Sequence, residues 1–249
     1  MISETAQMNH DLLCPDYSSK AKETDAELLE IFDNFAFDEV IAHDNIDTKT
    51  RIMVIVASTI ASQALTEFKM FVNAALTNGV TPVEVKEIVY QSVPYVGIAK
   101  VIDFLYATNE LCKEHDIVLP LESQSTTNPE NRYEKGLALQ KAIFGDLIDT
   151  MYEASPKNQL HIQKYLSANC FGDYLTRSGL DIKTRELLTY AMLISMGGTE
   201  SQVKGHILGN VNVGNTKETL IAVTTQLLPY IGYPRSLNAL KCLNDVIPK

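Results

Sequence analysis

The stretch DIKTRELLTYAMLISMGGTESQVKGHILGNVNVG, residues 181–214, decides the fold. Asp181 can accept hydrogen bonds from the free N–H groups of a first helical turn, so it predicts a helix over residues 182–196. Gly197-Gly198 ends this helix, because glycine adopts the left-handed backbone conformation without steric cost. Residues 182–196 are apolar or small around most of the helix, which is typical of a helix buried on more than one side.

A second helix is expected from about Thr199 to Val213. The three- and four-residue spacing of Thr199, Gln202 and His206 places them on one face of it. The helix before it carries a single acid, Glu186, at the start of its apolar run. A third helix follows Gly214 and ends near Pro229. One carboxylate and one imidazole therefore fall within the same small helical unit.

The same pattern occurs earlier in the chain. A shift of 134 residues, and of 135 after the glycine turn, matches structural positions of two tandem copies. The matched residues are Asp47, Lys49, Thr50, Arg51, Ala57, Ile60, Gly79, Thr81, Gln91, Pro94, Tyr95, Gly97 and Leu105 with Asp181, Lys183, Thr184, Arg185, Ala191, Ile194, Gly214, Thr216, Gln226, Pro229, Tyr230, Gly232 and Leu240.

The two copies differ at the positions of the candidate catalytic residues. Glu186 corresponds to Ile52, and His206 corresponds to Phe71. Only the second copy therefore retains a candidate acid/base pair.

This pattern resembles the carboxymuconolactone decarboxylase family, which includes the AhpD-like alkylhydroperoxidases. The resemblance is carried by Thr184-Arg185-Glu186-Leu187-Leu188, Gly205-His206, Gly214 and Tyr230-Ile231-Gly232-Tyr233-Pro234, and in weaker form by the first copy. It implies an all-α fold, an AhpD-like helical bundle in which two tandem repeats form a pseudo-dimeric chain. It also implies a closed homo-oligomer, such as a trimer, and a site without a metal or organic cofactor.

The resemblance further implies decarboxylation of a small-molecule substrate, a carboxylated lactone or a related oxo-acid. His206 would be the general acid/base, because an imidazole can donate and recover a proton near neutral pH. Glu186 would orient it, and Thr199, Gln202 and Tyr230 would line the substrate pocket.

The histidine and the acid also have structural interpretations. His206 could be a hydrogen-bonded core histidine. Glu186 could pair with Arg185 or Lys183 of its own chain, or with a basic residue of a neighbouring chain. Arg185 recurs as Arg51 in the copy that lacks the acid and the histidine. This recurrence favours structural ion pairing for both arginines.

Two alternative functions remain open. In AhpD-like proteins a Cys-x-x-Cys pair precedes the histidine, but Thr199 and Gln202 occupy those positions here. A peroxidase or peroxiredoxin-type activity would therefore depend on a single thiol, Cys170, which we expect on a loop before the site-bearing helices of the second repeat. The second alternative is a non-catalytic oligomeric binding protein.

The formal net charge of −10 argues against nucleic acid or an anionic membrane as a partner. The sequence contains no metal-type cluster of cysteines and histidines, and no apolar run long enough to span a bilayer. These features favour a cytoplasmic protein.

The composition divides the chain into four segments. Residues 1–22 are polar and turn-rich, with Pro15 and Ser18, and we expect a partly ordered N-terminal arm. The first repeat follows over residues 23–118. A linker of small polar residues is expected over 119–131, and the second repeat over 132–249.

Overall fold

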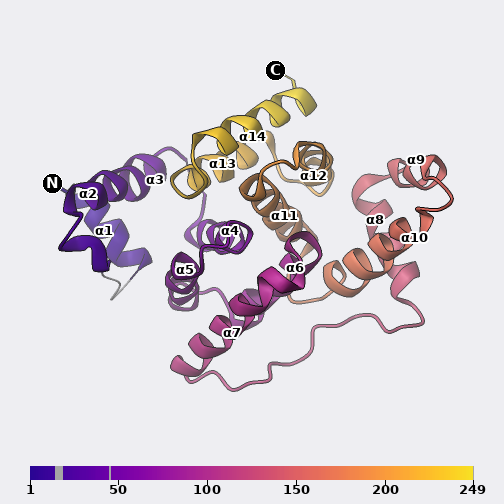
Figure 1. The fold of residues 1–249 in the computed structure, drawn as a ribbon, viewed down its shortest axis with the longest axis horizontal. Coiled ribbons are helices and arrows are strands. Elements are labelled where there is room, and N and C mark those ends of the chain that lie inside the picture. The colour runs from indigo at the N-terminus through magenta and orange to yellow at the C-terminus, as the bar shows by residue number, and fades with distance from the viewer. Residues whose placement is uncertain (15–18, 45, 249) are drawn as a thin grey trace.

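A computed structural model describes residues 1–14, 19–44 and 46–248 of the chain. The described residues form helices and irregular connections with no β-strand, which confirms the expected all-α, tandem AhpD-like architecture (Figure 1). Pro15 and Ser18, on which part of the arm prediction rested, lie outside the described residues.

Each repeat contributes four consecutive helices. In the first repeat these are α4 (Thr48–Ala61), α5 (Leu65–Thr77), α6 (Pro82–Val96) and α7 (Ile98–Glu114). In the second they are α11 (Ile182–Met196), α12 (Glu200–Asn212), α13 (Lys217–Ile231) and α14 (Tyr233–Val246). α11 has the bounds expected from its N-cap and glycine signals, and α12 begins and ends within one residue of the expected bounds.

The first helix of each set begins at an aspartate. Asp47 and Asp181 each accept a hydrogen bond at 2.9 Å from the backbone N–H three residues later, in Thr50 and Thr184. The threonine hydroxyls donate second bonds to the same carboxylates. Burial opposes ionisation of Asp181, but the bonds from Thr184 outweigh it and lower the pKa of the carboxyl.

Replacing Asp181 with alanine is expected to lower the free energy of unfolding by about 0.5–2 kcal/mol at neutral pH, since the cap bond is lost. Because the folded-state pKa is lowered, this contribution is present above the unfolded pKa of about 3.9 and disappears as pH falls through the folded pKa. Urea unfolding of both proteins at several pH values measures the difference. If the free energies of unfolding of the two proteins differed by the same amount at acid and neutral pH, the role of the ionised carboxylate would be contradicted.

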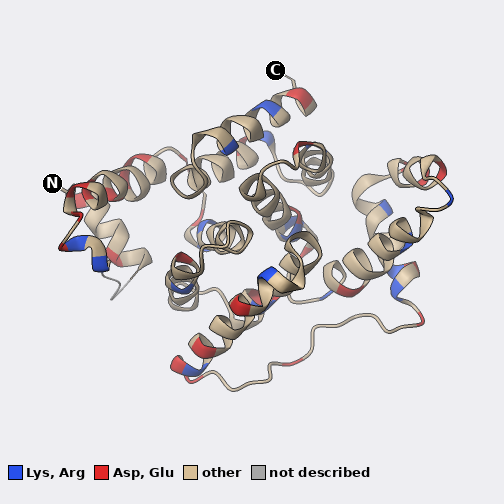
Figure 2. Ribbon diagram, in the orientation of Figure 1, with Lys and Arg blue, Asp and Glu red and all other residues tan. Residues whose placement is uncertain are grey.

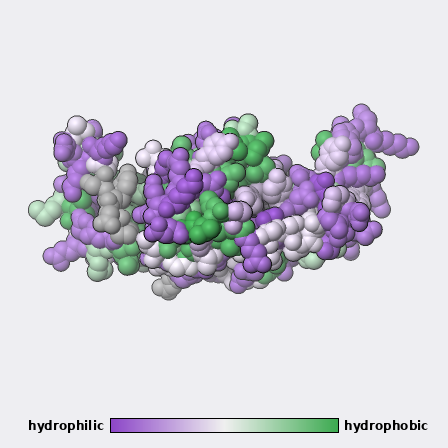
Figure 3. Space-filling model, turned by 90° about the horizontal axis from the view of Figure 1, so that it is seen from below, coloured by the Kyte–Doolittle hydropathy of each residue, from purple (hydrophilic) through white to green (hydrophobic). Residues whose placement is uncertain are grey.

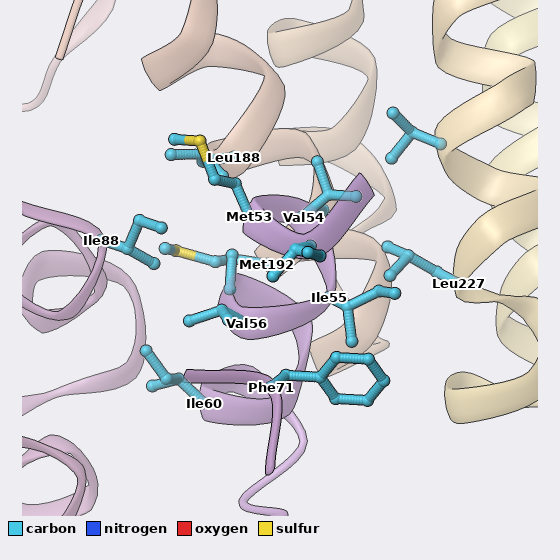
Figure 4. Packing of buried hydrophobic residues seen from close by; sticks show 14 of the residues in the cluster. Met53, Val54, Ile55, Val56, Ile60, Phe71, Ile88, Leu188, Met192 and Leu227 are labelled. Carbon is cyan, nitrogen blue, oxygen red and sulfur yellow. The ribbon is translucent and has the colours of Figure 1, made fainter. Parts of the chain in front are cut away.

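The two repeats share one core. α4 and α11 lie side by side at the centre, where α4 buries ten consecutive residues from Arg51 to Ile60 and α11 buries Arg185 to Ser195. Figure 4 shows side chains of both repeats, among them Val56 and Met192, packed together. Because α4 and α11 are each buried around most of their circumference, neither helix has a clear polar face in its sequence.

One helix of each repeat packs against the other repeat as well as against its own, an arrangement that we call helix exchange. α6 of the first repeat packs against α11 of the second, and α13 of the second repeat packs against α4 of the first. Side chains near the end of α6 therefore reach the second repeat, and those near the end of α13 reach the first.

Further helices precede each set. α1 (Glu4–Leu13), the 3₁₀ turn η1 (Lys20–Lys22), α2 (Ala26–Asn34), the π-helix η2 (Phe35–Glu39) and α3 (Val40–Ala42) precede the first. α8 (Arg132–Phe144), α9 (Leu147–Ala154), α10 (Leu160–Tyr165) and the π-helix η3 (Leu166–Leu175) precede the second. An extended segment without helix joins Glu114 to Arg132 (Figure 1).

Within the expected N-terminal arm, residues 4–13 form the helix α1, which the polar, turn-rich composition did not predict. Ser3 caps this helix by accepting a hydrogen bond from the Ala6 N–H at 3.0 Å. Asn9 donates a hydrogen bond to the carbonyl oxygen of Phe37 at 2.7 Å, which fastens α1 to η2. The helix is stabilised by this packing more than by its own polar sequence.

The chain's surface mixes polar and apolar residues. Figure 3 shows hydrophobic residues in separate groups among hydrophilic ones on the face seen from below. Among the residues that the structure describes, no helix has both the length and the apolar character required to cross a membrane.

Candidate active site

Glu186 and His206 form a hydrogen-bonded pair. The Nδ1 atom of His206, on α12, lies 2.8 Å from Oε2 of Glu186, on α11. The Glu186 side chain is fully buried, whereas 13% of the His206 side chain is exposed. The imidazole therefore lies between a buried carboxylate and the protein surface, and no residue in the described part of the chain hydrogen-bonds to its Nε2 atom.

The other oxygen of Glu186, Oε1, is buried and accepts no hydrogen bond from any residue in the described part of the chain. The proposed pairing of Glu186 with Arg185 or Lys183 is wrong, because its partner is His206. A buried carboxylate with one unused oxygen retains an acceptor for a ligand or a water molecule.

The close approach of α12 to α11 depends on Gly209. A Cβ atom at this position would lie 2.7 Å from Glu186 Oε2 and 2.8 Å from a ring carbon of Phe144. Asn210 then joins the two helices, since its Nδ2 donates to the carbonyl oxygens of Glu186 at 2.9 Å and of His206 at 2.7 Å. These contacts fix the separation of the acid and the imidazole.

Two aromatic rings stand edge-on to the imidazole. The centroid of Phe144, on α8, lies 5.4 Å from that of His206, and the centroid of Tyr95 lies 6.0 Å away. Tyr95 belongs to α6, so the first repeat completes the site of the second. Burial, together with Cys170 and Glu186 nearby, raises the pKa of Tyr95, and its hydroxyl stays protonated at neutral pH.

Cys170 lies close to this group, in η3 and not on the loop that we expected. Burial is the largest influence on its thiol. The carboxylate of Glu186 adds to it and the hydroxyl of Tyr95 opposes it, so that the pKa of Cys170 rises to about 12. The thiol is therefore un-ionised at neutral pH, the form that is a poor nucleophile.

The structure places Tyr230 away from His206. Its ring packs edge-on against Phe71 at 5.3 Å and Phe32 at 6.0 Å, on the side of the first repeat. The prediction that Tyr230 lines the His206 pocket is corrected: its counterpart Tyr95 occupies that place. The helix exchange is the physical reason, because it moves each tyrosine to the opposite repeat.

Thr199 and Gln202 precede His206 on the same helix. The Thr199 hydroxyl donates to the carbonyl oxygen of Leu193 at 2.8 Å and so closes the turn before α12. Gln202 is exposed, and its Oε1 accepts a bond from Ser201. Contact of either residue with substrate stays a prediction.

The recurring arginines bind across the repeats. Arg185 is wholly buried and donates to Glu87 Oε2 at 2.8 Å and to Gln91 Oε1 at 3.0 Å, both on α6. In the other copy, Arg51 donates to Gln226 of α13 at 2.9 Å. Both arginines therefore have structural partners, as their recurrence predicted. Within the described ranges, no three His, Cys, Asp or Glu side chains are grouped as metal ligands would be.

Comparison with known proteins agrees with this architecture. The sequence profile of the carboxymuconolactone decarboxylase family matches the chain twice, over residues 26–110 and 161–245. The chain belongs to the carboxymuconolactone decarboxylase family. A 4-carboxymuconolactone decarboxylase from Acinetobacter baylyi (strain ATCC 33305 / BD413 / ADP1) is 28% identical over 120 residues, which make up 48% of this chain and 89% of that protein.

Sequence reasoning missed several residues around the Glu186–His206 pair: Tyr95, Phe144, Gly209 and Asn210. The recurrence of Tyr95 and Tyr230 was visible in the sequence, but spacing alone does not say which repeat each tyrosine faces. Gly209 lies one helical turn after His206, so a small residue on the same face was a usable signal of close helix packing.

Proposed function

We propose that the protein catalyses cofactor-independent decarboxylation of a small carboxylated lactone or oxo-acid. The observation that carries the proposal is the 2.8 Å contact between a buried carboxylate and a partly exposed imidazole. The name of the Acinetobacter relative, a 4-carboxymuconolactone decarboxylase, supports the substrate class.

In the proposed reaction the bond between the carboxylate carbon and the ring or chain carbon breaks. Carbon dioxide leaves without the bonding electron pair, which is delocalised into the neighbouring carbonyl or double bond. His206 then donates a proton from Nε2 to the substrate carbon and recovers one from solvent. Glu186 accepts the Nδ1–H bond, which orients the ring and stabilises the protonated imidazole.

The direct test is to incubate the purified protein with 4-carboxymuconolactone and follow release of carbon dioxide. Turnover would support both the reaction and the substrate. Absence of turnover on this lactone and on a panel of carboxylated lactones and oxo-acids would reject the proposal.

Tyr95→Phe is expected to lower kcat/KM by about twofold to tenfold, because it removes a hydroxyl beside the imidazole that accepts a hydrogen bond from Thr189 at 3.2 Å. Tyr230→Phe is the matched control, because this tyrosine occupies the corresponding position beside Phe71. Equal effects of the two substitutions on kcat/KM would contradict the assignment of Tyr95 to the site.

The environment of Cys170 disfavours the thiol-based alternative. We expect Cys170 in the native protein to resist a thiol reagent such as iodoacetamide at pH 7 and to react once the protein is unfolded. Mass spectrometry of peptides after each treatment measures this. Rapid modification of native Cys170, or peroxide consumption abolished by Cys170→Ser, would favour the peroxidase function.

A further inference from the structure

A cavity lies in the N-terminal half, between α1, α2, α4, α5 and the end of α13. Its volume is about 600 Å³, within the range of small-molecule sites. Apolar walls come from Phe32, Phe37 and Met70, and polar groups come from Asp33, Ser62 and Tyr230. The cavity is separate from Glu186 and His206.

This cavity lies at the first-repeat counterpart of the candidate active site. Tyr230 lines it, as Tyr95 adjoins His206, and Phe71 replaces the imidazole against the tyrosine ring. The aromatic pair of α1 and η2, His10 with Phe37 at 5.0 Å, corresponds by the same 134-residue shift to Phe144 with Phe171 at 6.0 Å. The architecture of a site is thus retained where the Glu186/His206 pair is absent.

Asp33 contributes a half-buried carboxylate to this cavity. No residue in the described part of the chain donates a hydrogen bond to its carboxylate or forms an ion pair with it. Burial raises the pKa of Asp33, while His10 and Lys22 partly offset that effect. The carboxylate is therefore a half-buried acceptor that a cationic ligand could satisfy.

The charge around the cavity favours the same kind of ligand. Its wall includes the acids Asp11, Glu30, Asp33 and Glu67, against Lys22 and the titratable His10. Glu30 already pairs with the N-terminal amine at 2.7 Å. Figure 2 shows acidic residues along α2, so an anionic ligand would meet unfavourable potential there.

We propose that this cavity binds a small organic amine with an aromatic body. The ammonium group bonds to the Asp33 carboxylate, and the ring packs against Phe32, Phe37 and Met70. Decarboxylation is not required for this binding, because none of these residues contacts Glu186 or His206.

Tryptamine is a suitable probe, because the protein contains no tryptophan and the indole fluorescence comes from the ligand alone. Fluorescence anisotropy of tryptamine is measured against protein concentration. Indole-3-propionate, which carries a carboxylate on a similar ring, is the ligand control. Three variants are compared with the wild type: Asp33→Asn, Ser62→Phe, and Asp103→Asn as a matched control at an exposed aspartate of α7.

Tryptamine is expected to bind the wild type and Asp103→Asn equally, and Asp33→Asn at least about tenfold more weakly. Ser62→Phe, which places a ring in the cavity but keeps Asp33, is expected to abolish binding. Circular dichroism checks that each variant is folded. Absence of tryptamine binding to the wild type, equal binding of indole-3-propionate, or unchanged binding by both cavity variants would overturn the proposal.

Discussion

His206→Ala is expected to lower kcat for decarboxylation by about 10²–10⁴-fold, the usual contribution of a general acid/base. The substitution removes the one imidazole that lies 2.8 Å from the buried Glu186 carboxylate. Steady-state kinetics on a substrate confirmed for the wild type measures the effect. His161→Ala is the matched control, since His161 lies exposed on α10 and contacts Tyr165.

Glu186→Gln separates orientation of the imidazole from proton transfer by it. The amide can still contact Nδ1, but it cannot stabilise a protonated ring, so kcat should fall and the pH dependence of kcat should change. A structural role alone would lower stability without moving the pH profile. Unchanged kcat in both His206→Ala and Glu186→Gln would reject acid/base catalysis by this pair.

Gly136→Ala is expected to lower the free energy of unfolding by about 3 kcal/mol, the upper end of the usual range for overpacking. A Cβ atom on Gly136 of α8 would lie 1.9 Å from the carbonyl oxygen of Ser167 and 2.5 Å from the amide nitrogen of Gly172. Both are backbone atoms of η3, so the helices would have to separate. Chemical denaturation monitored by circular dichroism measures the loss.

Gly205→Ala provides the control for this prediction. Gly205 also lies within a helix, α12, but a Cβ atom there would have no neighbour within 4 Å. Alanine should therefore raise the free energy of unfolding by up to about 1 kcal/mol through its helix propensity. Equal effects of the two substitutions would show that the contact between α8 and η3 does not require glycine.

The fold was largely predictable because its signals are local. Asp181 and the glycines after Met196 fix the ends of α11, and a repeated pattern shows that the same unit occurs twice. α1 was missed because its sequence is polar and its burial comes from contact with η2. Cys170 was placed on a loop because the irregular π-helical turns of η3 lack a simple apolar period.

The site was predictable only in part. The sequence placed Glu186 and His206 on neighbouring helices, and the structure brings them into contact. It could not place Tyr95, since the choice between Tyr95 and Tyr230 depends on how two copies pack together. Packing between helices far apart in the sequence produces no residue spacing from which it could be predicted. For the same reason the sequence could not place Phe144, which contacts the imidazole from α8.

The exchange of Tyr95 and Tyr230 between the repeats has a consequence for how the sequence can change. Two identical single-repeat chains paired in this way must carry the same residues at both site positions, so loss of an acid from one is loss from both. Joining the repeats covalently removes that requirement. Of the two corresponding sites in this 249-residue chain, one has Glu186 and His206 and the other has Ile52 and Phe71. Each chain, whatever assembly it forms, therefore supplies one carboxylate–imidazole pair and not two.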